Sequence, residues 1–327
     1  MTRLQSAALA WVLIVLGVLA VHVFVPQRSG SFALSEVLEP YIALTGLVAC
    51  VVAFWAETRF ARVVVVVFLV LVTARCVPGS VSNPGPSIGT PLGVMAWNLG
   101  AGPEAGERAL AGLLKTEARL VGLEELQPAA ASAVAADPTL ASRMPFRVLT
   151  PEPTVLGMGL LSAYPILEHQ SYTDPPLIRA IVDPELGEPF AVFVVHPLPA
   201  RFQSVVRIPV ALDTTDRDAD IRMIRSMIDL DLAAGRSVIV LGDINTTERE
   251  PAYAELSAGL HDAHLDAGVG PGFTWRPPDI AFLPFGMLRI DYIFVSPPLM
   301  VGSTFTDCTA SSDHCRLEAT IYLGTQL

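Results

Sequence analysis

The chain has 327 residues, of which 52% are hydrophobic and 16% charged, and its mean hydropathy is +0.51. A soluble enzyme usually carries about 25% charged residues. The composition therefore excludes a wholly soluble protein, a disordered chain and a small scaffold held together by disulfides. The apolar excess lies almost entirely before residue 79.

Charge divides the chain in the same place. Five arginines and three glutamates precede residue 80, which leaves 16 basic and 29 acidic residues after it, a net charge of −13. Lys115 is the single lysine. So acidic a domain lacks the positive surface that grips long polyanions non-specifically. It can still act on a phosphate if a bound cation neutralises the site.

Three apolar runs predict a membrane anchor over residues 1–75. The run at 6–25 carries no formal charge and is long enough to cross a bilayer core of about 30 Å. With the runs at 41–56 and 61–75, we expect two to three transmembrane helices. Two alternatives stay open: the first run is a cleaved signal peptide, or the third is a buried strand or helix of the soluble part.

Arginines in short loops predict the orientation of this anchor. Arg3 precedes the first run, and Arg59 and Arg62 separate the second from the third, so both segments are expected on the cytoplasmic side. Arg75 is the one charge that opposes this orientation. We therefore predict a multi-pass protein of the cell membrane with an extracytoplasmic C-terminal domain. Within 6–25, 41–56 and the 63–73 core of the third run, His22 is the only histidine and no acidic residue, lysine or arginine occurs, which favours an anchor over a transporter.

Proline, glycine and serine are frequent over residues 76–92, which predicts an extended linker. The linker separates the anchor from one globular domain at 93–327, large enough to bury a sizeable core. Cys308 and Cys315 lie seven residues apart in this domain. They are consistent either with a disulfide in an oxidising compartment or with two free buried cysteines. Zinc-type cysteine spacing does not occur.

Short apolar runs separated by turn residues predict the elements of the domain. Helices are expected at 106–117 and 219–234. Strands are expected at 93–97, 120–123, 156–162, 178–182, 190–195, 237–241, 289–295 and 317–322.

Polar side chains recur where these apolar strands end. Those that follow a strand are Asn98, Glu125, His196, Asp243, Asn245, Asp313 and His314. Asp291 lies within a strand, in a position to join them. Any one of them could be an ordinary turn or cap residue. Because strand ends are rigid platforms, their joint occurrence predicts that they converge on one site.

In this order the motifs resemble the endonuclease/exonuclease/phosphatase superfamily, the deoxyribonuclease I-like fold, over residues 92–322. The matching motifs are AWN at 96–98, LEEL at 123–126, GLLSAYPI at 159–166, VVHP at 194–197, GDIN at 242–245, IDYIF at 290–294 and SDH at 312–314. The resemblance implies an α+β, four-layer α/β/β/α sandwich. In it, two mostly antiparallel sheets pack together, helices lie outside, and the site is at one end of the sheets.

The sequence departs from the family pattern in two places. Glu124 stands where the family usually has glutamine, and we expect it to add a negative charge near the site. GDIN replaces the commoner GDFN, a modest change in the core.

The resemblance also implies a metal-dependent phosphoric ester hydrolase. Oxygen ligands without thiolates suit Mg²⁺ or Mn²⁺. Glu125 is the implied direct ligand, with Asn98 and Asp313 near the same ion. These three residues are the expected metal site.

Five further residues carry implied catalytic roles. His314, paired with Asp291, would activate water or stabilise charge. Asp243 and Asn245 would position the nucleophile and bind phosphoryl oxygens. His196 would contact the phosphate or the leaving oxygen from the opposite side, as a donor or an acid.

The expected function is a membrane-anchored phosphoesterase acting on nucleic acid or on a lipid headgroup. The membrane tether favours a phospholipid phosphodiesterase, whereas the acidic surface weighs against a nuclease; a sugar- or inositol-phosphatase is the third reading. The alternative from another class is a non-catalytic, membrane-tethered binding module on the same fold. No protein partner can be inferred.

Three other features are given structural interpretations. Arg179 is read as a surface arginine rather than a phosphate contact. The run HDAHLD at 261–266 is read as a solvated helix end, because a metal clip would need a third ligand. Trp275 fits a pocket wall and a core position equally well.

Overall fold

The structure is a computed structural model that describes residues 1–56, 58–76, 84, 85, 88–102, 105–185, 187–206, 208–309 and 312–324. Most of the predicted linker at 76–92 lies outside these residues. The chain forms two compact units: one holds 1–79, 200–215 and 249–251, and the other holds 80–199, 216–248 and 252–327. The first is the helical unit and the second the sandwich unit.

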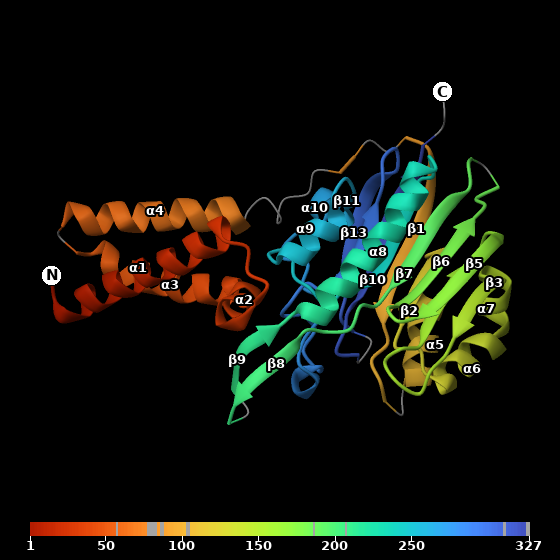
Figure 1. The fold of residues 1–327 in the computed structure, drawn as a ribbon, viewed down its shortest axis with the longest axis horizontal. Coiled ribbons are helices and arrows are strands. Elements are labelled where there is room, and N and C mark those ends of the chain that lie inside the picture. The colour runs from red at the N-terminus through yellow and green to blue at the C-terminus, as the bar shows by residue number, and fades with distance from the viewer. Residues whose placement is uncertain are drawn as a thin grey trace. The chain divides into compact units, whose positions relative to one another are not determined.

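The sandwich unit is built on two six-stranded sheets (Figure 1). The first has the order β13-β14-β1-β2-β4-β3, with bounds Met300–Asp307, Arg316–Leu323, Thr90–Asn98, Leu120–Glu124, Met158–Ser162 and Phe146–Thr150. The second has the order β11-β12-β10-β7-β6-β5, with bounds His261–Asp262, Asp291–Val295, Val238–Asp243, Phe190–Val195, Pro176–Val182 and Ile166–Thr173. The pairs β1/β2 and β7/β10 are parallel, and every other neighbouring pair in these two sheets is antiparallel.

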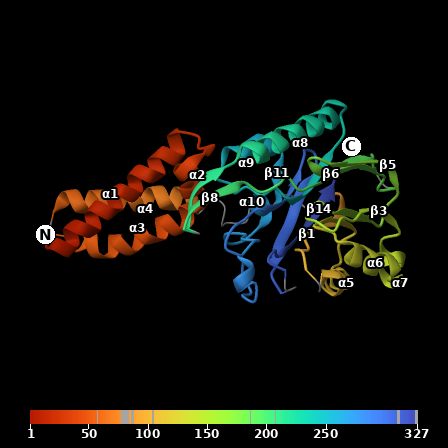
Figure 2. The ribbon, with the colours of Figure 1, turned by 60° about the horizontal axis from the view of Figure 1, so that its bottom comes forward.

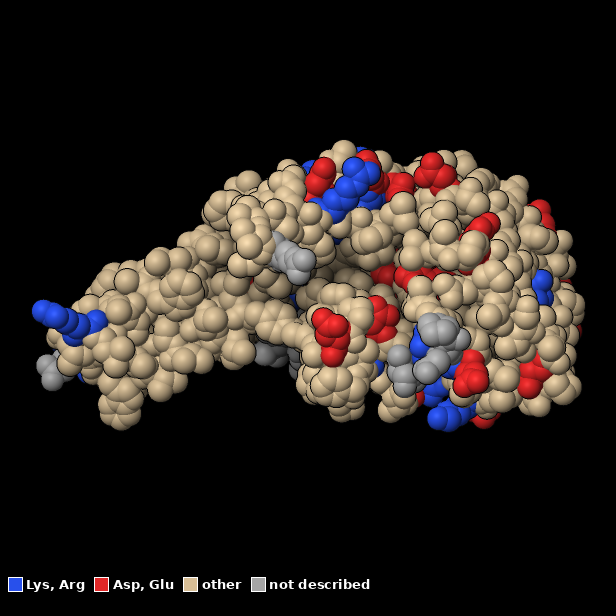
Figure 3. Space-filling view, turned by 90° about the horizontal axis from the view of Figure 1, so that it is seen from below, with Lys and Arg blue, Asp and Glu red and all other residues tan. Residues whose placement is uncertain are grey.

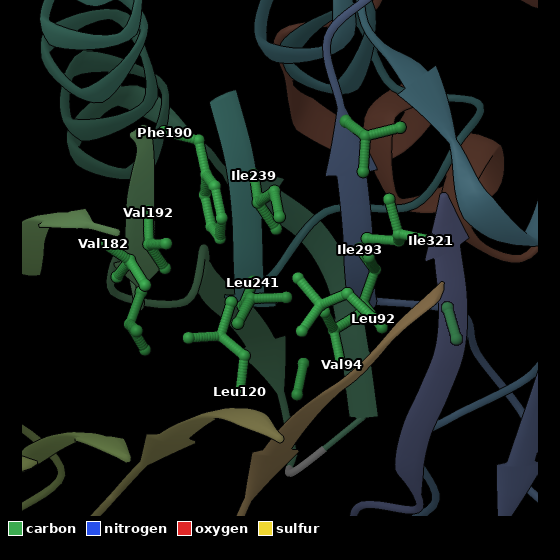
Figure 4. Close-up of a cluster of buried hydrophobic side chains, with 14 of the residues drawn as sticks. Leu92, Val94, Leu120, Val182, Phe190, Val192, Ile239, Leu241, Ile293 and Ile321 are labelled. Carbon is green, nitrogen blue, oxygen red and sulfur yellow. The ribbon is translucent and has the colours of Figure 1, made fainter. Parts of the chain in front are cut away.

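The core between the sheets explains why the central strands read as continuous apolar runs. In β7, Phe190, Val192 and Val194 face the other sheet, while Ala191, Phe193 and Val195 face the outer helices. Both faces are covered, so alternation between polar and apolar residues disappears. Figure 4 shows side chains of the two sheets meeting in this core, with Leu92, Val94 and Leu120 opposite Ile239, Leu241 and Ile293.

Helices cover the outer face of each sheet (Figure 2). The first sheet is covered by α5 (Ala105–Lys115), α6 (Pro128–Ala136) and α7 (Pro138–Arg143). The second is covered by α8 (Thr215–Ala233) and α9 (Pro251–Ser257). Two short elements, α10 (Ala263–Ala267) and η2 (Pro278–Ile280), follow. The predicted two-sheet sandwich with helices outside is confirmed.

The helical unit contains α1 (Arg3–Phe24), α2 (Gly30–Val37), α3 (Glu39–Phe54) and α4 (Arg59–Cys76). Among the described residues only α1 is by itself long and apolar enough to cross a membrane. The pair α2 and α3 passes the same test together, but it is bent by 74° at the break.

The expectation of two to three spans is therefore corrected: the described residues support one candidate span, or two if the bent pair is counted as one. The third predicted run fails because α4 places three arginines, Arg59, Arg62 and Arg75, within only 18 residues.

Polar groups inside the helical unit pair with one another. Glu39 is buried, and its Oε2 lies 2.9 Å from His22 Nδ1. Its Oε1 accepts a hydrogen bond from Arg75 Nε at 2.6 Å. One carboxylate thus joins α1, α3 and α4. It also gives a local partner to Arg75, the one charge that opposes the predicted orientation of the anchor.

Candidate active site

The strand pairings bring the predicted residues to one end of the sandwich unit. In the first sheet Asn98 pairs with Glu124, and in the second Gly242 pairs with Val195, so each sheet contributes the ends of one parallel pair of strands. Asn98 Nδ2 donates to Glu125 Oε1 at 3.2 Å and lies 3.0 Å from Asp243 Oδ2, across the gap between the sheets. Figure 3 looks onto this end from below, where acidic side chains are visible.

Two imidazoles converge on a single carboxylate. The Nε2 atoms of His196 and His314 each lie 3.6 Å from Asp243 Oδ2. On its other edge, His314 Nδ1 lies 3.0 Å from both carboxylate oxygens of Asp291. Asp291 begins β12 directly opposite Asp243, so the strand register places this pair. All four side chains are buried.

Burial and neighbouring charges shift the pKa values of the two histidines in opposite directions. Burial opposes charging of His314, but the nearby Asp291 and Asp243 outweigh it and raise its pKa to about 10. Burial and the repulsion of His314 lower the pKa of His196 to about 4. Burial, helped by Asp291 and opposed by His314, raises the pKa of Asp243 to about 7. At neutral pH His314 is therefore charged and His196 is neutral.

Glu124 lies where its surroundings oppose the negative charge that the sequence led us to expect. Its carboxyl is fully buried between the sheets, and neither oxygen has a hydrogen-bond partner. Burial, with repulsion from Asp291 and Asp243, raises its pKa well above the ordinary value. The adjacent Glu125 differs, because Asn98 Nδ2 and the Ala101 N–H both donate to its carboxylate.

Backbone conformation at two strand ends aims the site residues. Glu125 and Asn245 adopt left-handed φ values of 53° and 51°, which are uncommon outside glycine and concentrate at functional sites. The last turn-side residues of β10 also require Gly242: its φ is 146°, and a Cβ there would lie 2.1 Å from the Val195 carbonyl oxygen. Asn245 Nδ2 then donates to the Pro197 carbonyl at 3.0 Å, which ties the turn to the segment after His196.

The loop that carries Asp313 and His314 is held in place by a buried arginine that the sequence analysis missed. Arg276 is fully buried and donates to the carbonyl oxygens of Ala281, Cys308 and Ser312 at 2.7–3.1 Å. Its own backbone N–H donates to the Asp313 carbonyl at 3.0 Å. The only signal in the sequence was a charged residue in the stretch GFTWRP, next to the tryptophan that drew attention.

A disulfide closes the same loop. Cys308 and Cys315 are bonded, with Cα atoms 4.1 Å apart, which decides between the two states that the sequence left open. Ser312 Oγ, inside this loop, lies 3.1 Å from the Asn98 carbonyl oxygen and 3.1 Å from the His314 backbone N–H. The bridge therefore encloses the turn that positions both site residues.

Replacing both bridging cysteines with serine is expected to lower the free energy of unfolding by about 2–3 kcal/mol, because the short closed loop gains freedom in the unfolded chain. Urea unfolding of the full-length protein measures this, with the reduced wild type as the control that should match the variant. Equal unfolding free energies for the oxidised wild type and the variant would contradict the expectation.

The donor chemistry fits a hard divalent cation. Among the described residues, Asp243, Asp291 and His314 offer ligand atoms within 4.8 Å of one another. His314 is protonated at neutral pH, however, and a charged imidazole has no lone pair for a metal. Glu125 offers carboxylate oxygens in a site so rich in acidic groups that burial and Asp313 raise its pKa. Excess negative charge and oxygen donors are what Mg²⁺ and Mn²⁺ bind.

The other two predicted ligands lie beside Glu125. Asn98 Oδ1 accepts one hydrogen bond, from the Gly100 N–H at 3.0 Å, which leaves a lone pair. Asp313 is half-buried against the same backbone, close enough that a Cβ at Gly100 would lie 2.7 Å from Asp313 Oδ1.

Three other singled-out features have structural roles. Arg179 makes a two-pronged ion pair with Asp231 at 2.7 Å, so it holds α8 to its sheet. The 261–266 run is a helix start, but the expected solvation is wrong: Asp262 is buried and caps α10, and His264 is buried beside it. Trp275 is half-buried, and its backbone bridges to that of His314.

Comparison with known proteins agrees with this geometry. The model of the endonuclease/exonuclease/phosphatase family matches residues 95–314. Curated proteins give no match.

Similar solved structures include D. rerio TDP2 complexed with single-strand DNA product (19% identity, TM-score 0.54, 72% of this chain and 100% of that one). The human Nocturnin catalytic domain with bound sulfate is also similar (22%, 0.52, 71% and 93%). A third is a mannosyl-6-phosphatase of Bacteroides thetaiotaomicron (16%, 0.51, 71% and 100%). At these identities the likeness establishes the fold alone. The family match spans most of the chain, and the chain therefore belongs to the endonuclease/exonuclease/phosphatase family of phosphoric ester hydrolases.

Proposed function

We propose that this chain is a membrane-anchored, divalent-metal-dependent phosphoesterase that hydrolyses a phosphodiester or phosphomonoester of nucleic acid or of a lipid headgroup. The observation that carries the proposal is the convergence of His196 and His314 on Asp243, with Asp291 behind His314. Phosphoester hydrolysis needs a positioned nucleophile and a way to stabilise negative charge, and this arrangement supports both.

Glu125 would hold Mg²⁺ or Mn²⁺ directly, with Asn98 and Asp313 beside the same ion. When bound, the ion would polarise a phosphoryl oxygen and neutralise its charge. Asn98 also has a structural role that does not depend on the ion. Its amide nitrogen donates hydrogen bonds to the carboxylates of Glu125 and Asp243 and so fixes their separation.

The raised pKa of His314 supports one of the two roles that the sequence left open for it. A protonated imidazole cannot accept a proton from water, but it can donate to a phosphoryl oxygen and stabilise its charge. Asp291 holds the ring and keeps it charged. Asp243, whose pKa lies near 7, is then the group that orients the nucleophile and accepts its proton. The Asn245 backbone N–H donates to Asp243 Oδ1 at 2.9 Å and fixes that carboxylate.

His196 is proposed to act on the opposite side. Its Nδ1 lies 3.1 Å from the Val155 carbonyl oxygen, so the neutral ring carries its hydrogen there and presents a lone pair at Nε2. An arriving phosphate brings negative charge, which favours a second proton on this ring. His196 would then donate to the phosphate or to the leaving oxygen.

Membrane anchoring is proposed through α1, with the sandwich unit outside the cytoplasm. The supporting features are the length and composition of α1 and the arginines that flank the apolar runs.

The test uses the full-length protein in detergent with Mg²⁺, Mn²⁺ or EDTA. Phosphoester release is followed from duplex DNA, RNA, a phosphocholine lipid and inositol phosphates. We expect metal-dependent cleavage of one substrate class, lost in EDTA and restored by excess ion. Glu125→Gln is expected to raise the Mg²⁺ concentration for half-maximal activity at least about tenfold, because the substitution removes a ligand charge.

Glu168→Gln is the matched control. Its carboxylate side chain is 60% exposed and pairs with Arg179 rather than facing the site, so its Mg²⁺ dependence should equal that of the wild type. Activity that is unchanged in EDTA would refute the metal-dependent proposal. Metal binding without turnover on any substrate would instead support the binding-module alternative.

A further inference from the structure

The hairpin β8–β9 exposes several large apolar side chains on its surface. β8 (Arg201–Val205) and β9 (Ile208–Asp213) form a two-stranded sheet, and the last two residues of β9 also form isolated bridges outside it. Five large apolar side chains in the two strands and in the turn between them are 40–89% exposed. They are Phe202, Val205, Val206, Ile208 and Val210. An isolated two-stranded hairpin is marginally stable in water at best, so these side chains need a cover.

Charge indicates what kind of cover fits. The hairpin carries Arg201 and Arg207, and its one acidic residue, Asp213, lies at the base of β9 opposite Arg201, within a chain whose net charge is −11. Apolar side chains flanked by arginine suit the headgroup region of an anionic bilayer, where the chains enter the acyl boundary and the guanidinium groups meet phosphates. The surface of a partner protein in water does not offer an apolar layer and a layer of phosphates side by side.

The neighbours of the hairpin within the helical unit give its location along the anchor. Asp213 and Leu212 form bridges with Ser29 and Gly30, and Thr214 donates to the Arg28 carbonyl. Figures 1 and 2 both show β8 and β9 beside α2. These contacts follow the end of α1 at Phe24 by four to six residues. A chain extends at most about 3.5 Å per residue, so the hairpin base lies within about 20 Å of the end of α1.

We propose that the hairpin β8–β9 is a bilayer-contacting element whose Phe202, Val206 and Ile208 enter the interfacial region of an anionic membrane. The proposal rests on the membrane anchoring in the proposed function, since a span that ends at Phe24 brings the hairpin base to the bilayer surface. β8 starts five residues after His196. A membrane contact would thus be joined by a short segment to a histidine of the candidate site.

The experiment places a nitrobenzoxadiazole fluorophore at the hairpin turn of the full-length protein. The background is Cys50→Ser with Cys76→Ser, which leaves the disulfide in place; the labelled variant is Val206→Cys, at a position that is 89% exposed. Val269→Cys is the matched control, because Val269 is also valine, is 79% exposed and lies in the sandwich unit. Both proteins are reconstituted into vesicles of phosphatidylcholine and phosphatidylglycerol.

We expect a lipid-borne nitroxide to quench the probe at 206 severalfold and aqueous iodide to quench it weakly, with the reverse at 269. Equal iodide quenching at both positions, with no quenching by the lipid nitroxide, would overturn the proposal. A second measurement needs no variant: a photoactivatable lipid should label the wild type between residues 201 and 210. Disulfide cross-linking of two copies of unlabelled Val206→Cys, together with an absence of lipid adducts in the wild type, would show that a second copy is the cover.

Neither readout depends on turnover, so loss of the proposed hydrolytic activity would leave this result standing. Flotation of the same vesicles reports anchoring separately. A protein that fails to float overturns both the anchor and the hairpin contact, whereas a floating protein with a water-exposed probe at 206 overturns the hairpin contact alone.

Discussion

Replacing His314 with alanine is expected to lower kcat by about 10³-fold while the protein stays folded. The variant removes the charged imidazole that is 3.0 Å from Asp291 and 3.6 Å from Asp243, and positioned charge or proton donors of this kind contribute about 10²–10⁴-fold. Steady-state kinetics on the substrate found in the panel measures the loss. Undiminished turnover would remove His314 from the catalytic machinery.

His261→Ala is the matched control for this substitution. The His261 side chain is 40% exposed and its Nδ1 lies 3.0 Å from Asp266, away from the candidate site, so kcat should not change. Asp291→Asn gives a graded test of the pair, because it keeps the shape of the partner and removes the charge that raises the pKa of His314. A fall in kcat for this variant, smaller than that for His314→Ala, is expected.

Replacing Arg276 with alanine is expected to lower the free energy of unfolding by about 3 kcal/mol or more. The guanidinium is fully buried, and its removal leaves the carbonyl oxygens of Ala281, Cys308 and Ser312 without a donor. Each buried acceptor left unsatisfied costs about 1–3 kcal/mol. Arg276→Lys should rescue little, since an ammonium cannot reproduce the planar fork. Urea unfolding of the full-length protein measures both variants.

Arg222→Ala serves as the control for Arg276. The Arg222 side chain is 55% exposed and its guanidinium lies 3.9 Å from Glu255, so an effect within about 0.5 kcal/mol is expected. If Arg276→Ala and Arg222→Ala proved equally stable, the loop before Asp313 would not depend on the buried guanidinium.

The strands that build the candidate site could be predicted because burial on both faces makes them apolar throughout. The prediction for β7 at 190–195 coincides with the observed strand, and β2 and β10 differ by one or two residues at their ends. Elements without this signal were missed. β5 is an edge strand with mostly exposed residues, and α6 is a run of alanines without amphipathic spacing.

The electrostatic state of the site could not be predicted from motifs. The sequence places Glu124 next to Glu125, but only the fold reveals that the first carboxyl is buried between the sheets, where its pKa is raised. Arg276 was missed for the same reason, since its acceptors come from segments far along the chain. Motifs identify which residues meet, whereas the dielectric around them is a property of the tertiary structure.

The contact between Asn98 and Asp243 joins two separate sheets, and this has a consequence for how the family can diverge. Each sheet holds its own share of the reacting groups as a rigid body, so alignment between the two bodies is set by the packing of side chains such as Leu241 and Ile293. A change in volume there would shift one half of the machinery against the other without altering any reacting group. Substitutions at interior positions remote from the substrate would then change the catalytic rate. Relatives that share the same motifs would differ in rate through such substitutions.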